Sequence, residues 1–262
     1  MAELGNAQNH LAHAIQSLSR DTFPKALEAW LEAELQQDNF TVLAYFDGRR
    51  PLSIFRNAQV SAVHENFDRI YTAGAYLLDP FHDLHTNRAP TGVYRLSDVA
   101  PDKFHRNQYY LDYYSATTLL DELTFVAYPA PDVSLHICLG RDASSEKRFT
   151  AQDAAKARAI APVVIALADR QWAGLDAQGE YSGTAVIDRL IASLEQTDGI
   201  SLSPRQAEVA LLILRGHSSV SIGLELGISP QTVKVFRKQL YRKCAISSQA
   251  ELFNLMLPRL IE

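Results

Sequence analysis

Apolar side chains recur at helical spacing in the last quarter of the chain, where they predict a series of short helices. The first begins at Ser203-Pro204, because serine caps helix N-termini, proline is tolerated at the first helical position, and Gln206 completes a capping box. It ends at Gly216, since glycine readily takes the left-handed conformation that closes many helices. A second apolar-periodic helix spans Val220 to Leu226. Two helices this close together are typical of a helix-turn-helix unit.

A third helix is predicted after the turn at residues 227–230, where glycine permits a positive φ and Ser229 caps the next helix. Its apolar stripe consists of Val233, Phe236, Leu240 and Cys244. The opposite side carries Gln231, Lys234, Val235, Lys238 and Arg242. Between Glu225 and Glu251 the sequence has five basic residues and no acidic one. A helix that enters the phosphate-lined groove of DNA requires this charge distribution.

These residues resemble the LuxR/FixJ-type (GerE-like) helix-turn-helix of bacterial transcription regulators. The matching positions are Leu202–Gln206, Glu208, Val209, Gly216, Leu226, Ile228, Ser229, Thr232–Lys234 and Lys243. The resemblance implies an all-α, four-helix domain over residues 200–262 that binds double-stranded DNA. It places Lys234, Val235 and Lys238 at base edges in the major groove. It places Thr232, Arg237 and Arg242 near the phosphates.

Three positions depart from the family pattern, and none of them lies on the groove face. Ser221 stands where an acidic residue is usual, and Phe236 stands where histidine is common. Gly223 stands where alanine is usual, so we expect it to cost the second helix about 1 kcal/mol relative to alanine.

Ahead of this unit, residues 1–174 alternate between helical and strand patterns. The predicted helices span residues 6–19, 23–37, 60–75 and 150–172, the last opened by a Thr150 cap with Asp153 three residues later. The predicted strand pairs are 40–46 with 51–55, joined through Asp47-Gly48, and 122–128 with 133–139; residues 92–96 add a fifth strand. This order is typical of an α+β, PAS- or GAF-like sensor domain with an antiparallel sheet and helices on one face. Residues 175–199 are expected to be a linker and a connecting helix.

Charge divides unevenly between these two parts. From residue 201 onward the chain has eight Lys and Arg against four Glu, whereas residues 1–200 have 17 basic and 26 acidic residues. A basic DNA-binding domain thus follows an acidic body that we expect to stay off the DNA. Cys138 and Cys244 are far apart in apolar patterns and are expected to be reduced thiols. No leader and no apolar run near 18 residues is evident, so we expect a soluble, cytoplasmic protein without a membrane partner.

Residues 71–114 hold nine of the 24 aromatic side chains. Tyrosines gathered around a carboxylate suit a small ligand with an apolar part and a polar or cationic head. The candidate ligand-binding residues are Tyr71, Tyr76, Asp79, Phe81, Tyr94, Tyr110 and Tyr114. The alternative is that these rings are ordinary core residues.

The segment Tyr76–Pro80 resembles the Asp-Pro of the acyl-homoserine-lactone-binding domains that precede LuxR-type DNA-binding domains. Tyr94 lies where that family has a downstream tryptophan, but the upstream tryptophan, which would fall near Asn66 or Phe67, is missing. The resemblance implies that Asp79 accepts a hydrogen bond from a ligand. Asp79 also fits a helix N-cap followed by Pro80 at the first helical position.

Enzyme and metal chemistry find little support in the sequence. It has no G-x-S-x-G, P-loop, dinucleotide or zincin motif, so we expect neither catalysis nor a cofactor. His82 and His85 form an H-x-x-H without evident further ligands, so no metal is predicted. A receiver domain is disfavoured because the chain begins with two helices and contains hairpins.

The sequence therefore predicts a ligand-responsive transcription regulator whose front domain senses a small metabolite. We expect a homodimer on DNA, with RNA polymerase as a further partner. The alternatives are a quorum-sensing regulator that binds an acyl-homoserine lactone, and a regulator whose front domain docks a protein.

Overall fold

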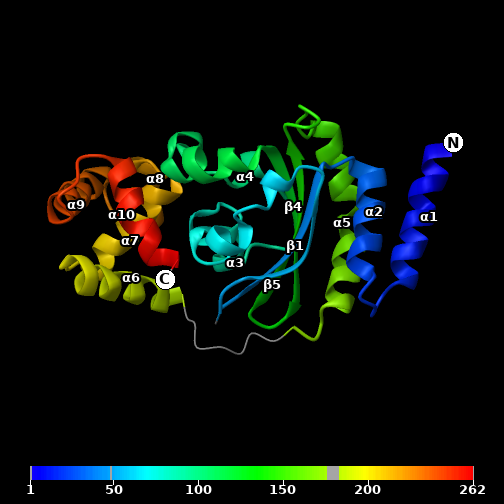
Figure 1. Cartoon of the computed structure of the whole chain (residues 1–262), viewed down its shortest axis with the longest axis horizontal. Helices are drawn as coiled ribbons and strands as arrows, with labels where there is room; N and C mark the ends of the chain where they lie inside the picture. The colour runs from blue at the N-terminus through cyan, green and yellow to red at the C-terminus, as the bar shows by residue number, and fades with distance from the viewer. Residues whose placement is uncertain (1, 48, 176–182, 262) are drawn as a thin grey trace.

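The computed structural model describes residues 2–47, 49–175 and 183–261. The chain forms a sheet domain and a helical domain with a layer of short helices between them (Figure 1). The first part of the predicted linker and connecting helix at 175–199 falls on residues 176–182, outside the described residues. The domain boundaries at 174 and 200 therefore stay a prediction.

Five strands form one antiparallel sheet in the order β2-β1-β5-β4-β3. They are β1 (Asn39–Phe46), β2 (Leu52–Ala58), β3 (Gly92–Arg95), β4 (Leu119–Ala130) and β5 (Val133–Asp142). Both predicted strand pairs and the fifth strand are confirmed. The two hairpins are adjacent because β1 also pairs with β5 along its whole length.

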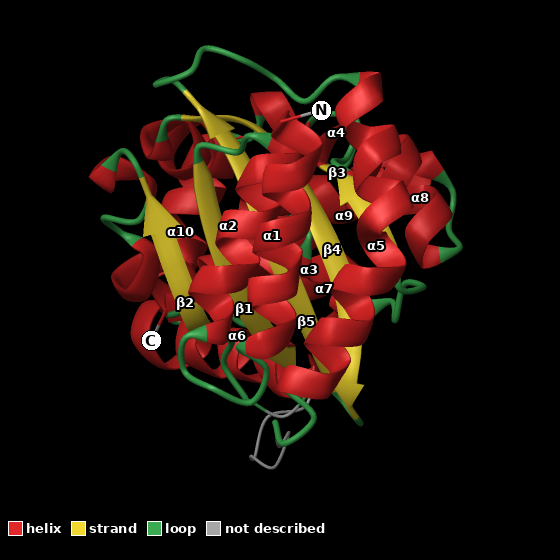
Figure 2. Cartoon of the chain, turned by 90° about the vertical axis from the view of Figure 1, so that its right-hand side faces the viewer, coloured by secondary structure: helices red, strands yellow, loops and turns green. Residues whose placement is uncertain are grey.

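Long helices cover one face of this sheet. They are α1 (Ala2–Gln16), α2 (Phe23–Leu35) and α5 (Ala151–Gln171), and Figure 2 shows them in front of the strands. Helix α5 begins with the predicted capping box between Thr150 and Asp153. Alternate strand residues, such as Phe125, Leu135 and Ile137, pack against α2 and α5 in a dry core.

The opposite face is covered by residues 60–91 and 96–117, on either side of β3 in the sequence, which we call the pocket layer. It contains η1 (Ser61–Val63), η2 (Phe67–Tyr71), η3 (Ala75–Leu78), α3 (His82–Thr86), α4 (Leu96–Val99), η4 (Phe104–Arg106), η5 (Tyr109–Tyr114) and η6 (Ser115–Thr117). Helical segments thus cover both faces of the sheet rather than the one face expected. The helix predicted over 60–75 is broken into short turns, because Asn66 and Gly74 depart from helical dihedral angles.

The helical domain lies beyond the pocket layer. Its helices are α6 (Gly183–Asp198), α7 (Pro204–Arg215), α8 (Ser219–Leu226), α9 (Pro230–Lys243) and α10 (Gln249–Ile261). The predicted capping box of Ser203 and Gln206 and the left-handed Gly216 are both present. The α+β sensor fold followed by an all-α helix-turn-helix domain is therefore confirmed.

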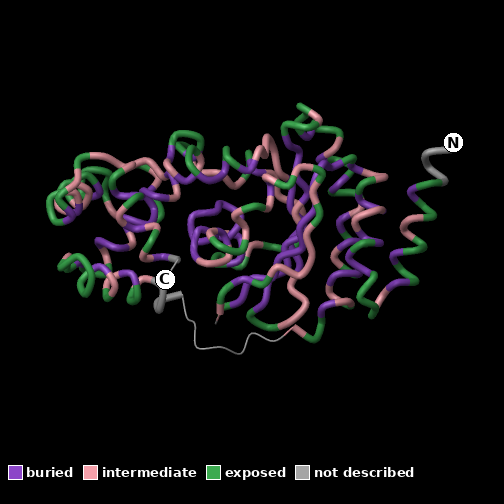
Figure 3. Tube along the Cα trace, in the orientation of Figure 1, coloured by how far each residue is buried: buried purple, intermediate pink, exposed green. Residues whose placement is uncertain are grey.

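Burial is concentrated in β1, β5 and the middle of β4, in α2 and α7, and in residues 74–82 of the pocket layer, whereas β2 and β3 have no fully buried residue (Figure 3). Among the described residues, no helix is both long enough and apolar enough to cross a membrane.

Candidate functional site: a DNA-reading helix and a buried polar pocket

Helix α9 buries one side and presents the other. Val233 and Leu240 are fully buried against the rest of the helical domain, whereas Lys234 and Lys238 are exposed. Val235 is 48% exposed beside them. Figure 1 shows α9 at the end of the molecule far from the sheet domain. The basic side of α9 is therefore accessible to DNA in this conformation.

The other predicted DNA contacts lie around this surface. Thr232 is exposed, and its hydroxyl bonds to the Ser229 cap. Arg242 is exposed in the last turn. Arg237 is half-buried because its guanidinium donates to the Tyr241 hydroxyl at 2.9 Å and lies over that ring. These DNA contacts stay predictions. To reach a phosphate, the Arg237 side chain must first break its contact with Tyr241.

The tight turn between α8 and α9 explains one departure from the family pattern. A Cβ added to Gly223 would lie 2.7 Å from the Ile228 carbonyl oxygen and 3.3 Å from the Pro230 nitrogen. The backbone after α8 must shift before alanine fits. Helix propensity favours alanine over Gly223 by about 1 kcal/mol. The close contact with the Ile228 carbonyl oxygen opposes this gain, because propensity scales describe a helix without tertiary neighbours.

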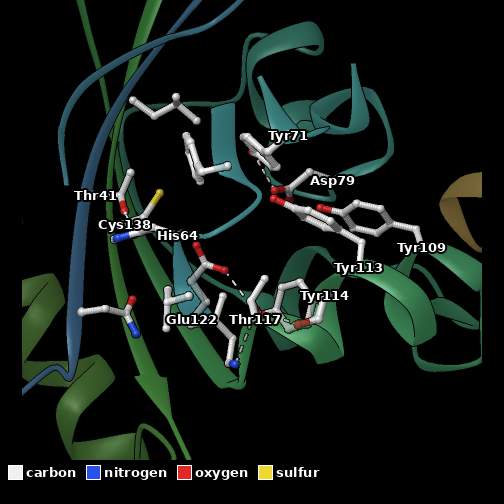
Figure 4. Close-up of a pocket in the computed structure, with 15 residues that line it drawn as sticks. Thr41, His64, Tyr71, Asp79, Tyr109, Tyr113, Tyr114, Thr117, Glu122 and Cys138 are labelled. Atoms are coloured by element: carbon white, nitrogen blue, oxygen red, sulfur yellow. Dashed lines mark hydrogen bonds between the residues drawn. The ribbon is translucent and has the colours of Figure 1, made fainter. Parts of the chain in front are cut away.

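A cavity of about 60 Å³ lies between the sheet and the pocket layer (Figure 4). The strands supply Asn39, Thr41, Leu43, Leu119, Glu122 and Cys138. The pocket layer supplies Val63, His64, Phe67, Tyr71, Asp79, Tyr109, Tyr113, Tyr114 and Thr117. Polar atoms of both layers therefore meet inside the domain, where each needs a partner.

Asp79 lies deep in this cavity, 7% exposed. Its Oδ2 accepts from the Tyr71 hydroxyl at 2.7 Å, and its Oδ1 accepts from the Phe81 backbone N–H at 2.8 Å. The carboxylate caps the turn before α3 and faces the cavity, but the N-cap of α3 is Phe81, so the predicted N-cap at Asp79 with Pro80 at the first helical position is wrong. That Asp79 accepts a hydrogen bond from a ligand stays a prediction. Burial raises the pKa of Asp79 to about 6, although both hydrogen bonds favour the charged form.

Glu122 is the second carboxylate of the cavity, and the sequence analysis missed it. It lies on β4 and accepts from the Tyr114 hydroxyl at 3.3 Å. Burial, followed by the charge of Asp79, raises the pKa of Glu122 to about 8. One feature of the sequence points to it: the neighbouring alternate residues Leu123, Phe125 and Ala127 face the dry core, so Glu122 must face the other side of a central strand.

The remaining polar lining groups are neutral near pH 7. Burial, followed by the charge of Arg56, lowers the pKa of His64 to about 4, and its Nε2 lies 3.1 Å from the Thr41 hydroxyl. Burial raises the pKa of the Cys138 thiol well above its usual range. Cys138 and Cys244 are both free thiols, as expected.

Three of the seven predicted ligand-binding residues line the cavity, namely Tyr71, Asp79 and Tyr114. The other four lie outside its lining. Tyr76 packs on His82, and Phe81 is buried in the core beside α3. Tyr94 lies on β3 and donates to the Pro90 carbonyl, and Tyr110 stacks on Tyr114. Tyr109 and Tyr113, which are four residues apart on η5, line the cavity together with Tyr114, whereas Tyr110 does not.

His82 and His85 are buried and pack around Tyr45 with His136. The Ser134 hydroxyl lies 2.8 Å from His85 Nδ1 and 3.2 Å from His136 Nε2. Burial keeps the pKa of His136 near 3. Within the described ranges, no cluster of three or more His, Cys, Asp or Glu is arranged to hold a metal ion.

The pocket layer also holds the helical domain. Arg215, at the end of α7, forms a 2.7 Å ion pair with Asp83 and donates from Nε to the Leu77 carbonyl at 2.8 Å. Its side chain is only 18% exposed, so this contact is shielded from solvent. Leu77 and Asp83 flank Asp79, and all three belong to one short stretch of chain.

A second contact involves Asn107, which is 1% exposed. Its Oδ1 accepts from the Tyr110 backbone N–H at 2.7 Å at the start of η5, and its Nδ2 donates to the Leu214 carbonyl at 3.1 Å. The Gly216 carbonyl accepts from the Lys103 N–H, and a Cβ on Gly216 would lie 2.9 Å from Phe104 Cα. The Arg215 and Asn107 contacts together form what we call the docking contact.

Comparison with known proteins supports this division of the chain. The family of bacterial regulatory proteins named luxR (GerE) matches residues 200–256. An HTH-type transcriptional regulator in the exeN 3′ region of Aeromonas salmonicida is 30% identical over 190 residues, which cover 70% of this chain and 95% of that protein.

The front domain has relatives among solved structures. The VqsR LBD domain from Pseudomonas aeruginosa covers 64% of this chain and 98% of its own, with 25% identity and a TM-score of 0.55. Escherichia coli SdiA covers 95% of this chain and 96% of its own, with 16% identity and a TM-score of 0.40. With a LuxR-type ligand-binding fold ahead of a matching helix-turn-helix, this chain belongs to the LuxR family of bacterial DNA-binding transcription regulators.

Proposed function

We propose that this regulator responds to a small molecule that binds the cavity between the sheet and the pocket layer. Occupancy of the cavity sets how the pocket layer holds the helical domain, and therefore where the basic side of α9 lies. Lys234, Val235 and Lys238 read base edges, while Thr232, Arg237 and Arg242 contact phosphates.

One observation carries this proposal: the segments that line the cavity are the segments that grip the helical domain. Asp79 contacts the cavity, and Asp83, four residues later, pairs with Arg215. Asn107 caps the helix that carries Tyr109, Tyr113 and Tyr114, and the same side chain bonds to Leu214. A ligand that shifts either segment has a short covalent path to the docking contact.

A homodimer is part of the proposal. A single helix-turn-helix contacts too little DNA to be selective, so two copies are expected on a two-fold-related site, with half-site centres about one helical turn apart. The helical domain is basic and the front domain acidic, which supports DNA binding through the helical domain alone.

An acyl-homoserine lactone is less well supported as the effector. The family has tryptophans at the positions near Phe67 and at Tyr94. Here Tyr94 lies outside the cavity, and Phe67 has no ring N–H to donate to a ligand. The 60 Å³ cavity leaves little room for a lactone ring together with an acyl chain.

Native mass spectrometry of the purified full-length protein tests the proposal. We expect a bound small molecule, or binding from a metabolite mixture, and a change in DNA affinity when it is removed or added. A protein that binds no small molecule and holds DNA equally tightly under all these conditions would contradict the proposal and favour a front domain that docks a protein partner.

A further inference from the structure

We infer that the cavity takes a small organic cation, a primary alkylammonium whose N–H groups donate to Glu122 and Asp79 while its carbon chain lies against the tyrosine rings. This inference rests on the proposed function and adds the chemical class of the effector. It follows from the charge, the aromatic walls and the size of the cavity.

The charge of the cavity is one-sided. Its lining includes two carboxylates and no lysine or arginine. Neither Asp79 nor Glu122 has a salt-bridge partner among the residues that the structure describes. His64, the one basic side chain of the lining, stays neutral near pH 7. A buried carboxylate is normally either paired with a cation or protonated, so a cation that binds here takes the place of the proton on Glu122.

Glu122 is the less satisfied of the two carboxylates. Asp79 already accepts at 2.7 and 2.8 Å, whereas Glu122 accepts at a long 3.3 Å from the Tyr114 hydroxyl and from the Cys138 thiol, which is a weak donor. An ionised carboxylate accepts about four hydrogen bonds. An ammonium group with three N–H donors therefore supplies what Glu122 lacks.

Aromatic rings line the rest of the cavity. Tyr71 stacks with Phe67 at 4.7 Å between ring centroids and with Tyr113 at 6.2 Å, and Tyr109 stacks with Tyr113 at 5.4 Å. Figure 4 shows the Tyr109 and Tyr113 hydroxyls directed toward Asp79. The ring faces are taken up by stacking on one another, so the cavity meets phenol hydroxyls and ring edges; these suit a ligand with a polar head and a short alkyl chain.

The size of the cavity limits the ligand. A volume of about 60 Å³ is roughly four to six times the 10–15 Å³ that one water requires. A ligand of roughly five non-hydrogen atoms, such as n-butylammonium, therefore fits without opening the pocket layer.

The affinity for an ammonium ion is expected to rise with pH. Burial holds the pKa of Glu122 at about 8, so its carboxylate forms between about pH 7 and 9. The groups that act on it from β5, η5, the turn before α3 and β4 are Cys138, Tyr114, Asp79 and Asp121. Tyr114 and Cys138 have raised pKa values and stay neutral in this range, while Asp79 is ionised above about pH 6.

Isothermal titration of the full-length protein with three isosteric probes tests the inference: n-butylammonium, n-butanol and butyrate, with N-butanoyl-homoserine lactone as a fourth probe. We expect n-butylammonium to bind at least about tenfold more tightly than each of the others, because charge-assisted hydrogen bonds to buried carboxylates are strong. Glu122→Gln is expected to remove this preference. Glu28→Gln, a half-buried carboxyl on α2 outside the cavity lining, is the matched control and should retain it.

Equal or tighter binding of the alcohol, the carboxylate or the lactone would overturn the inference, as would an unchanged preference in Glu122→Gln. Binding of one of those three probes with a change in DNA affinity would leave the proposed function standing without the ammonium ligand. If no probe binds and native mass spectrometry finds no other bound molecule, both the inference and the proposed function fail.

Discussion

The two faces of the central sheet are built from the same strands but differ in chemistry. In β5, Leu135, Ile137 and Leu139 face α2 and α5 and are completely or almost completely buried among apolar side chains. Between them, Ser134, His136 and Cys138 face the pocket layer. In β4, Phe125 faces the dry core, whereas Glu122 faces the cavity.

The difference teaches where stability and function are located in this domain. The dry face gains free energy from the burial of apolar surface. The pocket face buries carboxyl, imidazole and phenol groups that cost free energy unless partners satisfy them. Polar burial of this kind, next to the docking contact, is therefore the better indicator of a ligand-responsive surface. Substitutions on the dry face, at the docking contact, on α9 and on the pocket face test this contrast.

The largest effect is expected from Phe125→Ala on the dry face. Phe125 is fully buried, so its truncation should lower the free energy of unfolding by about 3–5 kcal/mol through lost burial and a new cavity. Urea denaturation measures this loss. Leu224→Ala, at a side chain that is 82% exposed, should change stability by less than about 0.5 kcal/mol. Equal losses in the two variants would mean that the dry face is not the main source of stability.

Arg215→Ala should have the next largest effect, because it removes the ion pair with Asp83 and the bond to the Leu77 carbonyl. Loss of charged hydrogen bonds of this kind costs about 1.5–3 kcal/mol. Small-angle scattering is expected to show a more extended molecule. Arg205→Ala is the matched control, since Arg205 pairs with Glu208 and donates to the Leu226 carbonyl within the helical domain. Identical scattering from the two variants would argue against the docking contact.

The same contrast between a buried and a presented side applies to α9. Lys238→Ala should weaken binding to the cognate DNA site by about 1–3 kcal/mol, and Lys234→Ala should relax the preference at one base position. Fluorescence anisotropy with cognate and randomised sites measures both effects. Unchanged affinity in Lys238→Ala, with unchanged selectivity in Lys234→Ala, would remove α9 from base recognition.

Glu122→Gln tests the pocket face of the ligand-free protein, and its effect depends on pH. The pKa of Glu122 is about 8 in the folded state and has its ordinary value of 4.5 in the unfolded chain. Stability is therefore lost as the pH rises from about 4.5 through 8. Glu122→Gln should therefore raise the melting temperature at pH 9 relative to the wild type and leave it similar at pH 4. A melting temperature that falls in Glu122→Gln at pH 9 would mean that Glu122 is ionised and paired in the empty cavity.

Two buried histidines have the opposite effect on the pH dependence of stability. The pKa values of His64 and His136 are lowered to about 4 and 3, so the stability that depends on their neutral forms is lost as the pH falls from 6.5 through those values. His136→Gln is expected to flatten this acid limb in thermal melts. An unchanged acid limb would show that other groups control it.

Local sequence chemistry was sufficient to predict the helical domain. Ser203, Gln206, Gly216 and Ser229 act through contacts within a few residues, so the caps and turns follow from spacing alone. Strand pairing was also predictable, because both hairpins are local. The pairing of β1 with β5, which joins the two hairpins into one sheet, was not predicted because these strands are far apart in the sequence.

The cavity was less predictable because it depends on contacts between distant segments. Alternation along β4 marks Glu122 as facing away from the dry core, but only the pairing of strands brings it near Asp79. The tyrosines of η5 adopt an irregular helix, so regular spacing does not show that Tyr109 and Tyr113 enter the cavity while Tyr110 does not. The Gly223 turn shows the same limit, since helix propensity takes no account of the Ile228 carbonyl.

The central claim is that the cavity and the DNA-reading helix are coupled through the docking contact. The most direct measurement is the DNA affinity of full-length wild type and Arg215→Ala, each with the cavity ligand absent and at saturation. We predict that the ligand changes the affinity of the wild type by about 5- to 150-fold and that of Arg215→Ala much less. The same ligand-dependent ratio in both proteins would contradict the claim.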